Sequence, residues 1–522
     1  MSLPLELEVD FITPELILPE TLTIPIEQMS CEEYVEHLNY LKSDELPELK
    51  ESAAIVVGKL SEEYSKVMFA GRYQILQTSL NDTVEFHMPN ELKQFNKDLK
   101  IPYMDGDKRK YKQIFEIFEE ATNAPKFGRV EFNPARIGDY GKTKNLFRGF
   151  PFANDVQVPF KFNFFGDIHS DLSLAEAKEL ITHATVNYPR AVRVIEHIFH
   201  NIADGNEALG IQILAYIADI LQNPERSPLV ALILKSKEKG TGKSILAAII
   251  QALVGERLSL KTKELNHLIG KHNDHLIDKL VVVGEELSFG GSHDTNDKIK
   301  DLVSSGHQAI EPKFKSVIQV RKYFRLILCT NKDWAVAASS DERRYIIAEA
   351  APHQAQNDEY FAPMLDENKK ISKLMLKDLF NFLMSLDISN VDLSKGVETT
   401  GLRNQKIESM SPLEQWWSSV LEDEGISEHI SSTYMHTIKH IDGRLVSKQL
   451  VHTAYLEWLE KFKPNDKTRI TNAAAFGRQF INMASNKNTN LINGKDKKNE
   501  NKQNCYKFGD IEELKLFFDS SF

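Results

Sequence analysis

A short glycine-containing segment near the middle of the chain constrains the fold more than any other feature. Residues 236–245 read SKEKGTGKSI, and they follow the apolar run Leu229–Leu234. A helical pattern extends from Ile245 to Leu253. A buried strand, a glycine loop ending in GKS and a helix make up the phosphate-binding P-loop, in which backbone N–H groups and the helix N-terminus surround a polyphosphate. The sequence therefore predicts an α/β core that binds a nucleotide.

Five consecutive residues of this loop are expected to bind the nucleotide: Gly240, Thr241, Gly242, Lys243 and Ser244. Lys243 is expected to contact the β- and γ-phosphates, and the Ser244 hydroxyl to bind Mg²⁺. Lys237 stands where the full motif has its first glycine, although the two later glycines still allow a tight turn against phosphate. A chance GKS triplet is the alternative, and the flanking strand and helix argue against it.

Two acidic residues end the next strongly apolar strand pattern. Residues 279–286 read KLVVVGEE and lie about forty residues after the P-loop, where a Walker B element belongs. One carboxylate of such a pair holds Mg²⁺, and its neighbour polarises the attacking water. We assign Glu285 to Mg²⁺ and Glu286 to the water, and the reverse assignment stays open. An acidic strand end that only faces solvent is the alternative.

A further strand pattern, residues 324–331 with the sequence FRLILCTN, ends in an amide. In P-loop motors an asparagine at this point lies between the acidic pair and the γ-phosphate and helps to orient water. We therefore expect Asn331 to act as this sensor. An asparagine that merely starts a turn is the alternative.

Two adjacent arginines, Arg343 and Arg344, precede another strand pattern. Arginines in this position suit a finger that crosses a subunit boundary and stabilises transition-state charge in a neighbour's site. Which of the two is the finger stays open. An ion pair with Asp341 or Glu342 is the alternative.

A hairpin is expected between the acidic pair and Asn331, with Lys313, Phe314 and Lys315 near its tip. Lysines there would contact DNA phosphates, and the aromatic ring would stack on a base or separate the strands. A solvated turn with one packed phenylalanine is the alternative.

Composition limits what surrounds this core. The chain has 522 residues, of which 42% are hydrophobic, so it is long enough for several domains. No apolar stretch approaches the ~20 residues that cross a membrane. The three cysteines are far apart and form neither a zinc-ligand nor a disulfide pattern, which fits a reducing cytosol. The net charge of −11 argues against a protein coated with nucleic acid, but it allows DNA in a local basic groove or pore.

The patterns along the chain predict five parts in order. These are an N-terminal α+β region of uncertain role, a helical collar, the P-loop core, a linker and a C-terminal helical domain resembling a winged helix. Their predicted bounds are 1–165, 166–225, 226–388, 389–411 and 412–522.

The order of these motifs resembles that of the superfamily 3 helicases, the AAA+ ring motors of viruses, phages and mobile elements. It is most similar to the helicase module of phage and poxvirus-type primase–helicases. Beyond the core, residues 218–224 resemble that group's upstream collar, and residues 145–150 and 398–417 resemble signatures around its helicase module. The likeness extends over roughly residues 60–520 and is strongest over 210–350.

This resemblance implies an ATP hydrolase and DNA helicase with an AAA+ core, in which Mg²⁺ accompanies ATP. It implies a hexameric ring with ATP sites at subunit interfaces, acting on single-stranded or forked DNA in replication of a phage or mobile element. The expected location is the cytoplasm of a bacterial host, and a separate primase or polymerase is an expected partner. Two alternatives remain: an AAA+ initiator or remodeller without processive unwinding, and a nucleotide-gated scaffold that does not hydrolyse.

The sequence patterns at the two ends of the chain indicate a function less specifically than the P-loop core does. Asp105-Gly106-Asp107 has the D-x-D form found in primases, but it precedes three basic residues in a glycine turn, so we predict a turn and no primase. Residues 435–510 contain fourteen Lys and Arg against seven Asp and Glu. With helical patterns at 448–461 and 472–483 and a lysine-rich wing at 486–504, this part is expected either to track DNA phosphates or to be a solvated face.

Overall fold

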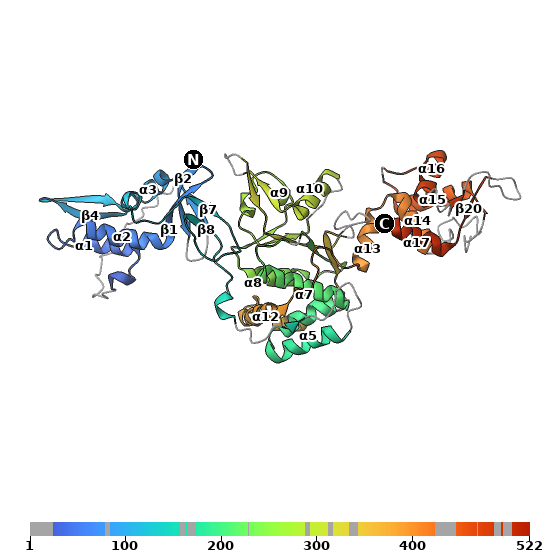
Figure 1. Ribbon diagram of the computed structural model, residues 1–522, viewed down its shortest axis with the longest axis horizontal. Coiled ribbons are helices and arrows are strands. Elements are labelled where there is room, and N and C mark those ends of the chain that lie inside the picture. Colours follow the sequence, from blue (N-terminus) through green and yellow to red (C-terminus); the bar gives the residue numbers. More distant parts are fainter. Residues whose placement is uncertain are drawn as a thin grey trace, which may run out of the picture. The chain divides into compact units, whose positions relative to one another are not determined.

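The computed structural model is a mixed α/β structure, as predicted (Figure 1). It describes residues 25–78, 84–156, 162–163, 174–227, 229–287, 293–311, 317–332, 343–422, 445–466, 468–484, 492–493 and 504–521. The chain divides into two units, 1–131 with 138–145 and 132–137 with 146–522. None of the described helices is both long and apolar enough to span a bilayer.

The first unit contains a four-stranded sheet of order β3-β2-β1-β6. Ala70 and Gly71 have φ of 49° and 74° and form the two-residue turn between β1 and β2, which glycine favours. Asp105 ends β4, and Gly106 turns the chain with φ of 61°, so the predicted turn is confirmed. The elements of this unit are η1 (Ile26–Gln28), α1 (Cys31–Tyr40), α2 (Leu49–Glu63), β1 (Tyr64–Phe69), β2 (Arg72–Thr78), β3 (Val84–His87), α3 (Pro89–Phe95), β4 (Lys100–Asp105), β5 (Lys108–Gln113), α4 (Ile114–Glu120), β6 (Lys126–Phe127), β7 (Arg129–Glu131) and β8 (Thr143–Asn145).

A five-stranded parallel sheet forms the centre of the second unit. Its order is β11-β12-β15-β10-β16. Its strands are β10 (Ala231–Lys235), β11 (Ser259–Thr262), β12 (Val281–Glu285), β15 (Arg325–Thr330) and β16 (Tyr345–Glu349). The P-loop strand β10 is thus central, and β15 separates it from the acidic strand β12.

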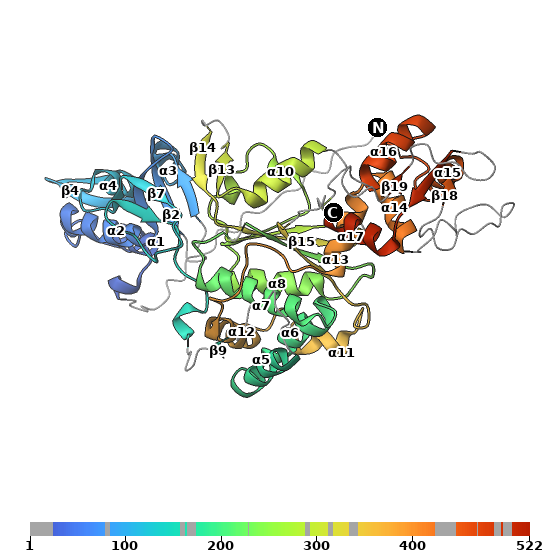
Figure 2. The ribbon, with the colours of Figure 1, turned by 45° about the vertical axis from the view of Figure 1, so that its right-hand side comes forward.

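Helices cover both faces of this sheet, which explains the continuous apolar runs of its strands (Figure 2). On one face, Ile233, Val282 and Ile347 pack with side chains of α9 (Asn266–Ile269) and α10 (His293–Ser304). On the other face lie α7 (Glu207–Gln222) and α8 (Lys243–Val254), with α12 (Lys373–Ser385) packed against both of these helices.

The helical part before the sheet includes an unusual segment. Its elements are α5 (Leu174–Asn187), α6 (Val192–Glu196), the π-helix η3 (His197–Ile202) and α7. The π-helix is the unusual segment.

A fully buried ion pair joins α7 to the start of β15, with Arg325 Nη2 2.6 Å from Asp219 Oδ2. The guanidinium also donates to the backbone carbonyls of Asp219 and Asn223. This pair ties the helical part to the central sheet.

Residues 389–411, for which a linker is predicted, lie on the edge strand of the sheet. Thr399 Oγ1 donates to the carbonyl of Ile347 at 3.1 Å, and Gly396 N–H donates to the carbonyl of Arg343. The helix α13 (Thr400–Ser409) then packs on β16. The smaller elements of this part are η2 (Ala153–Asp155), β9 (Phe162–Asn163), η4 (Asp274–Leu276), β13 (His307–Ile310), β14 (Ile318–Arg321), α11 (Asp358–Phe361), η5 (Ala362–Met364) and β17 (Leu386–Asp387).

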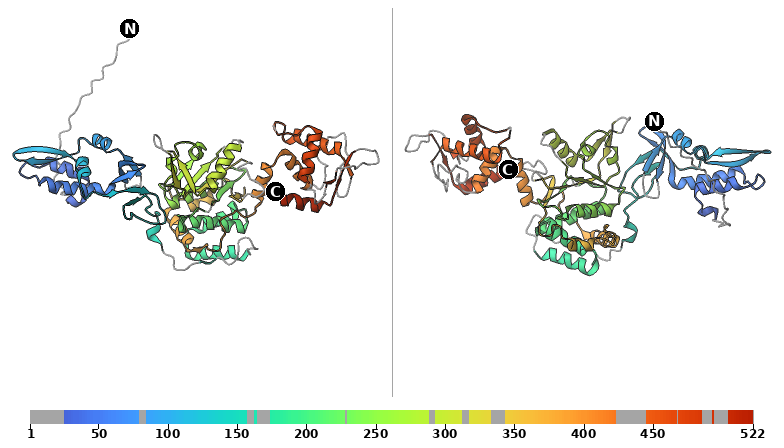
Figure 3. Two further views of the ribbon diagram at one scale, coloured as in Figure 1. Left: turned by 45° about the horizontal axis from the view of Figure 1, so that its top comes forward. Right: turned by 180° about the vertical axis from the view of Figure 1, so that it is seen from behind.

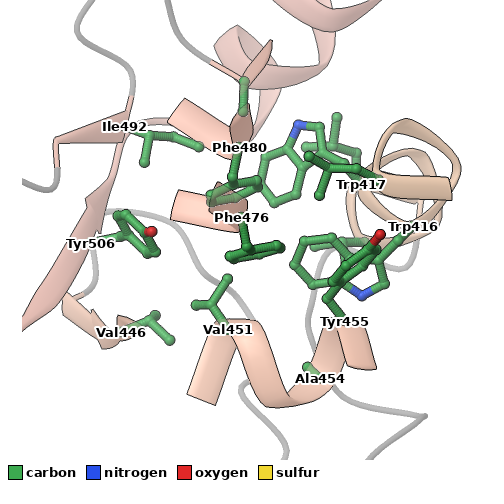
Figure 4. Close-up of a cluster of buried hydrophobic side chains, with 14 of the residues drawn as sticks. Trp416, Trp417, Val446, Val451, Ala454, Tyr455, Phe476, Phe480, Ile492 and Tyr506 are labelled. Carbon is green, nitrogen blue, oxygen red and sulfur yellow. The ribbon is translucent and has the colours of Figure 1, made fainter. Parts of the chain in front are cut away.

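The C-terminal part, drawn as a ribbon in Figure 3, has its own aromatic core, whose side chains are drawn in Figure 4. Trp416 lies 5.5 Å from the Tyr455 ring, and Trp417 lies 5.0 Å from the Phe480 ring, both edge-on. A three-stranded sheet of order β18-β20-β19 completes this part. Its elements are α14 (Pro412–Glu422), β18 (Leu445–Ser447), α15 (Lys448–Phe462), α16 (Ala473–Ala484), β19 (Ile492–Asn493), β20 (Cys505–Phe508) and α17 (Ile511–Ser521).

Candidate active site

The carboxyl ends of β10, β12 and β15 meet around a cavity of about 510 Å³. Parallel strands bring the loops that follow them to one edge of a sheet, so residues distant in sequence converge there. The residues lining the cavity are Lys239, Gly240, Thr241, Gly242, Lys243, Ser244, Ile245, Lys263, Glu285, Glu286, Cys329, Thr330, Asn331, Gln356, Asp358 and Phe361. The cavity therefore combines the predicted P-loop residues, the acidic pair and the sensor.

The P-loop connects β10 to α8 through two left-handed glycines. Gly240 has φ of 76°, and Gly242 has φ of 88° directly before the first residue of α8. A Cβ atom on Gly242 would lie 2.4 Å from the His197 ring and 2.7 Å from the Phe361 ring. Both the backbone conformation and the packing therefore require glycine at this position. The loop presents the N-terminus of a twelve-residue helix to the cavity.

Lys243 reaches across the cavity floor and is only 7% exposed. Its Nζ donates to Asn331 Oδ1 at 2.8 Å, and it also contacts the hydroxyls of Ser236 and Thr241. Burial lowers the pKa of Lys243, while the nearby Cys329 and Glu286 oppose this shift. The structure thus joins the P-loop lysine directly to the predicted sensor amide.

The acidic pair lies where β12 ends. Glu286 has φ of 50°, which is rare for a residue with a side chain, and its N–H donates to the carbonyl of Cys329 at 2.8 Å. The strand therefore turns sharply between the two carboxylates. Glu285 Oε1 lies 2.8 Å from Lys261 Nζ, a residue of β11. One carboxylate is ion-paired, and the next one is exposed at the cavity.

The strand β15 lies between the two halves of the site. Cys329 is paired with Glu285 on one side, and Leu234 is paired with Cys329 on the other. The side chain of Cys329 is buried, and this burial raises the pKa of its thiol to about 12. A neutral thiol therefore fills the space beneath the charged groups, and Asn331 follows at the strand end.

A segment after β16 forms the far wall. Gln356 has φ of 58°, and its N–H donates to the carbonyl of Gly240 at 3.1 Å. Asp358 and Phe361 line the cavity from the short helix α11. Sequence reasoning missed this wall, because nothing in the local pattern of residues 352–361 indicates contact with a loop more than a hundred residues earlier.

The two arginines lie elsewhere. In the register of β10 and β16, Ala231 pairs with Tyr345 and Lys235 pairs with Glu349. Arg343 and Arg344 thus precede β16 at the amino end of the sheet, whereas the cavity is at the carboxyl end. A strand rises about 3.3 Å per residue, so the two ends of β16 are about 13 Å apart. Neither arginine lines the cavity of its own chain.

The predicted hairpin is present as the antiparallel pair β13 and β14, with Ile310 opposite Ile318. Asn273 braces it, donating to the carbonyl of Ala309 and accepting from the N–H of Glu311. Its predicted DNA-contacting residues Lys313, Phe314 and Lys315 lie outside the described residues.

The donor set suits a polyphosphate with a divalent cation. Lysine and backbone N–H groups at a helix N-terminus bind anionic oxygens. Ser244 and Glu285 supply the hydroxyl and carboxylate oxygens that Mg²⁺ prefers. No cluster of three His, Cys, Asp or Glu able to hold a metal occurs within the described parts of the chain.

Three further polar residues near the site were not predicted: Lys261, His197 and Asn201. Lys261 is paired with Glu285, and the other two contact P-loop carbonyls from η3. Each belongs to an element that reaches the site only through tertiary packing. The four residues of β11 do not alternate between buried and exposed positions, and no sequence signal marks the π-helix.

Comparisons with known proteins concern parts of the chain and its fold. Residues 234–344 match DUF5906, which is described as a family of unknown function. No curated protein matches the sequence. The structure resembles two structures of the NrS-1 C-terminal region, both with a TM-score of 0.51, at 13% and 14% identity. Each match covers 86% of this chain and 97% of that chain. At this identity the likeness concerns the fold alone.

Proposed function

We propose that this chain is an ATP-dependent DNA helicase of the superfamily 3 type, with an AAA+ core, that serves replication of a phage or mobile element. The observation that carries the proposal is the convergence of Lys243, Glu286 and Asn331 on one cavity. The segments that follow three separate strands contribute these groups, and the 2.8 Å contact between Lys243 and Asn331 joins two of them. A charge run or a chance motif would not bring them together.

Each group has a role that follows from its chemistry. Lys243 and the P-loop N–H groups neutralise charge on the β- and γ-phosphates. Ser244 and Glu285 would hold Mg²⁺, which adds positive charge next to the transferring phosphoryl group. Glu286 polarises the attacking water and takes up its proton, and Asn331 orients that water. Glu285 is ion-paired with Lys261 whereas Glu286 is exposed at the cavity, which supports different tasks for the two acids.

The arginines would act on a neighbouring copy. Arg343 and Arg344 are at the amino end of the sheet, about 13 Å of strand away from the carboxyl end. An arginine that acts at the cavity would therefore come from a second chain, as expected for a ring with sites between subunits. The cavity lining contains lysines but no arginine among the described residues.

The C-terminal part supports DNA as the substrate. Its order of α14, β18, α15, α16, β19 and β20 is that of a winged helix. A groove of about 770 Å³ between α15 and α16 contains Lys448, His452 and Arg478, and its described lining includes no acidic residue. The first turns of α16 expose Ala473 and Ala474, small side chains that allow close approach to a duplex.

The test compares ATP turnover, with and without single-stranded DNA, with displacement of a forked duplex. Lys243→Ala should lower turnover about a hundredfold or more, because it removes the charge opposite the phosphates. Glu286→Gln should keep nucleotide binding and lose turnover. The matched control is Lys237→Ala, which changes an exposed lysine of the same loop that does not line the cavity.

The outcomes separate the alternatives. DNA-stimulated turnover with strand displacement, both lost in Lys243→Ala and kept in Lys237→Ala, would support the helicase. Turnover without displacement would favour an initiator or remodeller. Nucleotide binding without turnover in the assembled protein would favour a scaffold. No nucleotide binding at all would overturn the proposal.

A further inference from the structure

The π-helix η3 places two buried polar side chains against the outside of the P-loop. Its wide turns are visible in the bond from Ala203 N–H to the carbonyl of Ile198, five residues earlier. π-helical turns are rare in proteins as a whole, and many of those that occur lie at functional sites. His197 and Asn201 are fully buried on this segment, and neither lines the cavity. They therefore contact the P-loop from the side opposite the proposed nucleotide.

Both side chains contact P-loop carbonyls. Asn201 Nδ2 donates to the carbonyl of Thr241 at 2.6 Å. His197 Nε2 lies 3.4 Å from the carbonyl of Gly242, and its Nδ1 lies 3.3 Å from the Tyr360 hydroxyl. Burial lowers the pKa of His197 to about 4, so the ring is neutral near pH 7. A neutral ring that donates from Nε2 accepts at Nδ1, which is where the tyrosine hydroxyl lies.

Because the peptide bond is planar, these contacts to the carbonyls also set the direction of the neighbouring N–H groups. In a trans peptide, the carbonyl of one residue and the N–H of the next point to opposite sides. A Thr241 carbonyl held by Asn201 therefore turns the N–H of Gly242 toward the cavity. A Gly242 carbonyl held by His197 and by the Leu246 N–H does the same for the N–H of Lys243. These N–H groups are the ones that a P-loop offers to phosphate.

We propose that Asn201 and His197 are positioning residues that fix the two P-loop peptides with their N–H groups facing the phosphate site. This inference rests on the proposed nucleotide binding. Such contacts matter in this loop because glycine adopts positive and negative φ about equally well, so glycine alone does not fix the orientation of its neighbouring peptides. The peptide before Gly242 can reverse at little steric cost unless the Thr241 carbonyl is held, whereas the Gly242 carbonyl also accepts from the Leu246 N–H of α8 at 3.0 Å, so His197 adds to a helical hydrogen bond there. The helical part before the sheet thus sets the geometry of the nucleotide site.

The experiment replaces each contact by a side chain of similar shape. Asn201→Leu removes the donor and leaves the Thr241 carbonyl without it, and His197→Phe keeps a ring and removes Nε2. His197→Gln retains a donor near the same place and serves as the conservative rescue. The matched control is Gln212→Met on α7, an equally buried amide that donates to the carbonyls of Asp392 and Lys395 instead.

The readouts are the dissociation constant of a fluorescent ADP, its displacement by pyrophosphate, and the unfolding temperature. Asn201→Leu should weaken binding of both ligands by roughly ten- to a hundredfold, the effect of one misplaced buried hydrogen bond. His197→Phe should weaken it by a smaller factor, because the Leu246 N–H still holds the Gly242 carbonyl. His197→Gln should bind nearly as the wild type does. Gln212→Met should lower the unfolding temperature and leave binding unchanged.

Wild-type affinity in both Asn201→Leu and His197→Phe would overturn the inference while leaving the proposed function intact. So would an equal loss of binding in Gln212→Met, because the effect would then come from general destabilisation. Absence of ADP binding by the wild-type chain would instead overturn the proposed function, and the inference with it.

Discussion

The ion pair between Lys261 and Glu285 gives a prediction with an unusual sign. Lys261 Nζ lies 2.8 Å from Glu285 Oε1, and the lysine is 48% exposed whereas the carboxylate is 13% exposed. In the proposed mechanism this carboxylate holds Mg²⁺, so the ammonium and the metal compete for the same oxygen. Lys261→Met, which keeps the aliphatic stem, should therefore strengthen Mg²⁺ binding.

The expected size follows from the exposure of the lysine. Half-exposed ion pairs contribute about 0.2–1 kcal/mol, which corresponds to roughly a 1.4- to 5-fold change in an equilibrium constant. The concentration of Mg²⁺ that half-saturates nucleotide binding should fall by this factor in Lys261→Met. Because water and salt reach the lysine, the difference should shrink as ionic strength rises.

The assay titrates Mg²⁺ at a fixed concentration of fluorescent ATP, at low and high salt. Lys263→Met is the matched control, because Lys263 lines the cavity and no ion pair recorded among the described residues joins it to Glu285. An unchanged or raised Mg²⁺ requirement in Lys261→Met would refute the reasoning. An equal change in Lys263→Met would show that net charge alone is responsible.

Three further predictions concern the residues around this site. Gly242→Ala should abolish nucleotide binding measured by fluorescence titration, because its Cβ would lie 2.4 Å from the His197 ring in a left-handed conformation; normal binding would contradict this. Asp219→Asn leaves the buried Arg325 guanidinium without its carboxylate and should lower the free energy of unfolding by about 3 kcal/mol in urea titrations; a loss below about 1 kcal/mol would contradict a tightly packed pair. Burial lowers the pKa of His197 from 6.5 to about 4, so the folded protein holds the neutral ring where the unfolded chain would bind a proton. The free energy of unfolding should therefore be highest above about pH 6.5 and fall by about 2 kcal/mol as the pH falls to about 5. The unfolding temperature should depend less on pH in His197→Gln than in the wild type, and equal pH dependence would contradict this assignment.

The α/β class and the elements around the P-loop could be predicted because their signals are local. The apolar run of β10, the glycines and the helix α8 are consecutive in the sequence, and only a buried strand fits so short a run before a glycine turn. The antiparallel pair β13 and β14 was predicted for the same reason. Asn331 and Glu286 line one cavity because both follow parallel strands.

The wall formed by Gln356 and the contacts of Asn201 could not be predicted, because polar residues in loops and helices carry no sign of their partners. Their positions depend on packing between segments more than a hundred residues apart or on a π-helical turn without a sequence signature.

The position of the arginines, in contrast, follows from the topology of the sheet. Arg343 precedes the parallel strand β16, whereas the P-loop follows the parallel strand β10. The parallel register of these strands therefore places the arginine and the P-loop at opposite ends of the sheet.

The central position of β10 also determines when the nucleotide site can form during synthesis. Its two neighbours in the sheet are β15 and β16, so Ile233 pairs with Leu328 on one side and with Ile347 on the other. Until the ribosome has released residues to about 330, the apolar strand of the P-loop has neither of these hydrogen-bonding partners, and its second edge lacks β16 until about residue 349. Contacts of this sequence separation are slow to form and expose strand edges to other chains. The first unit, whose β1 and β2 are joined by two residues, can form its hairpin long before that point.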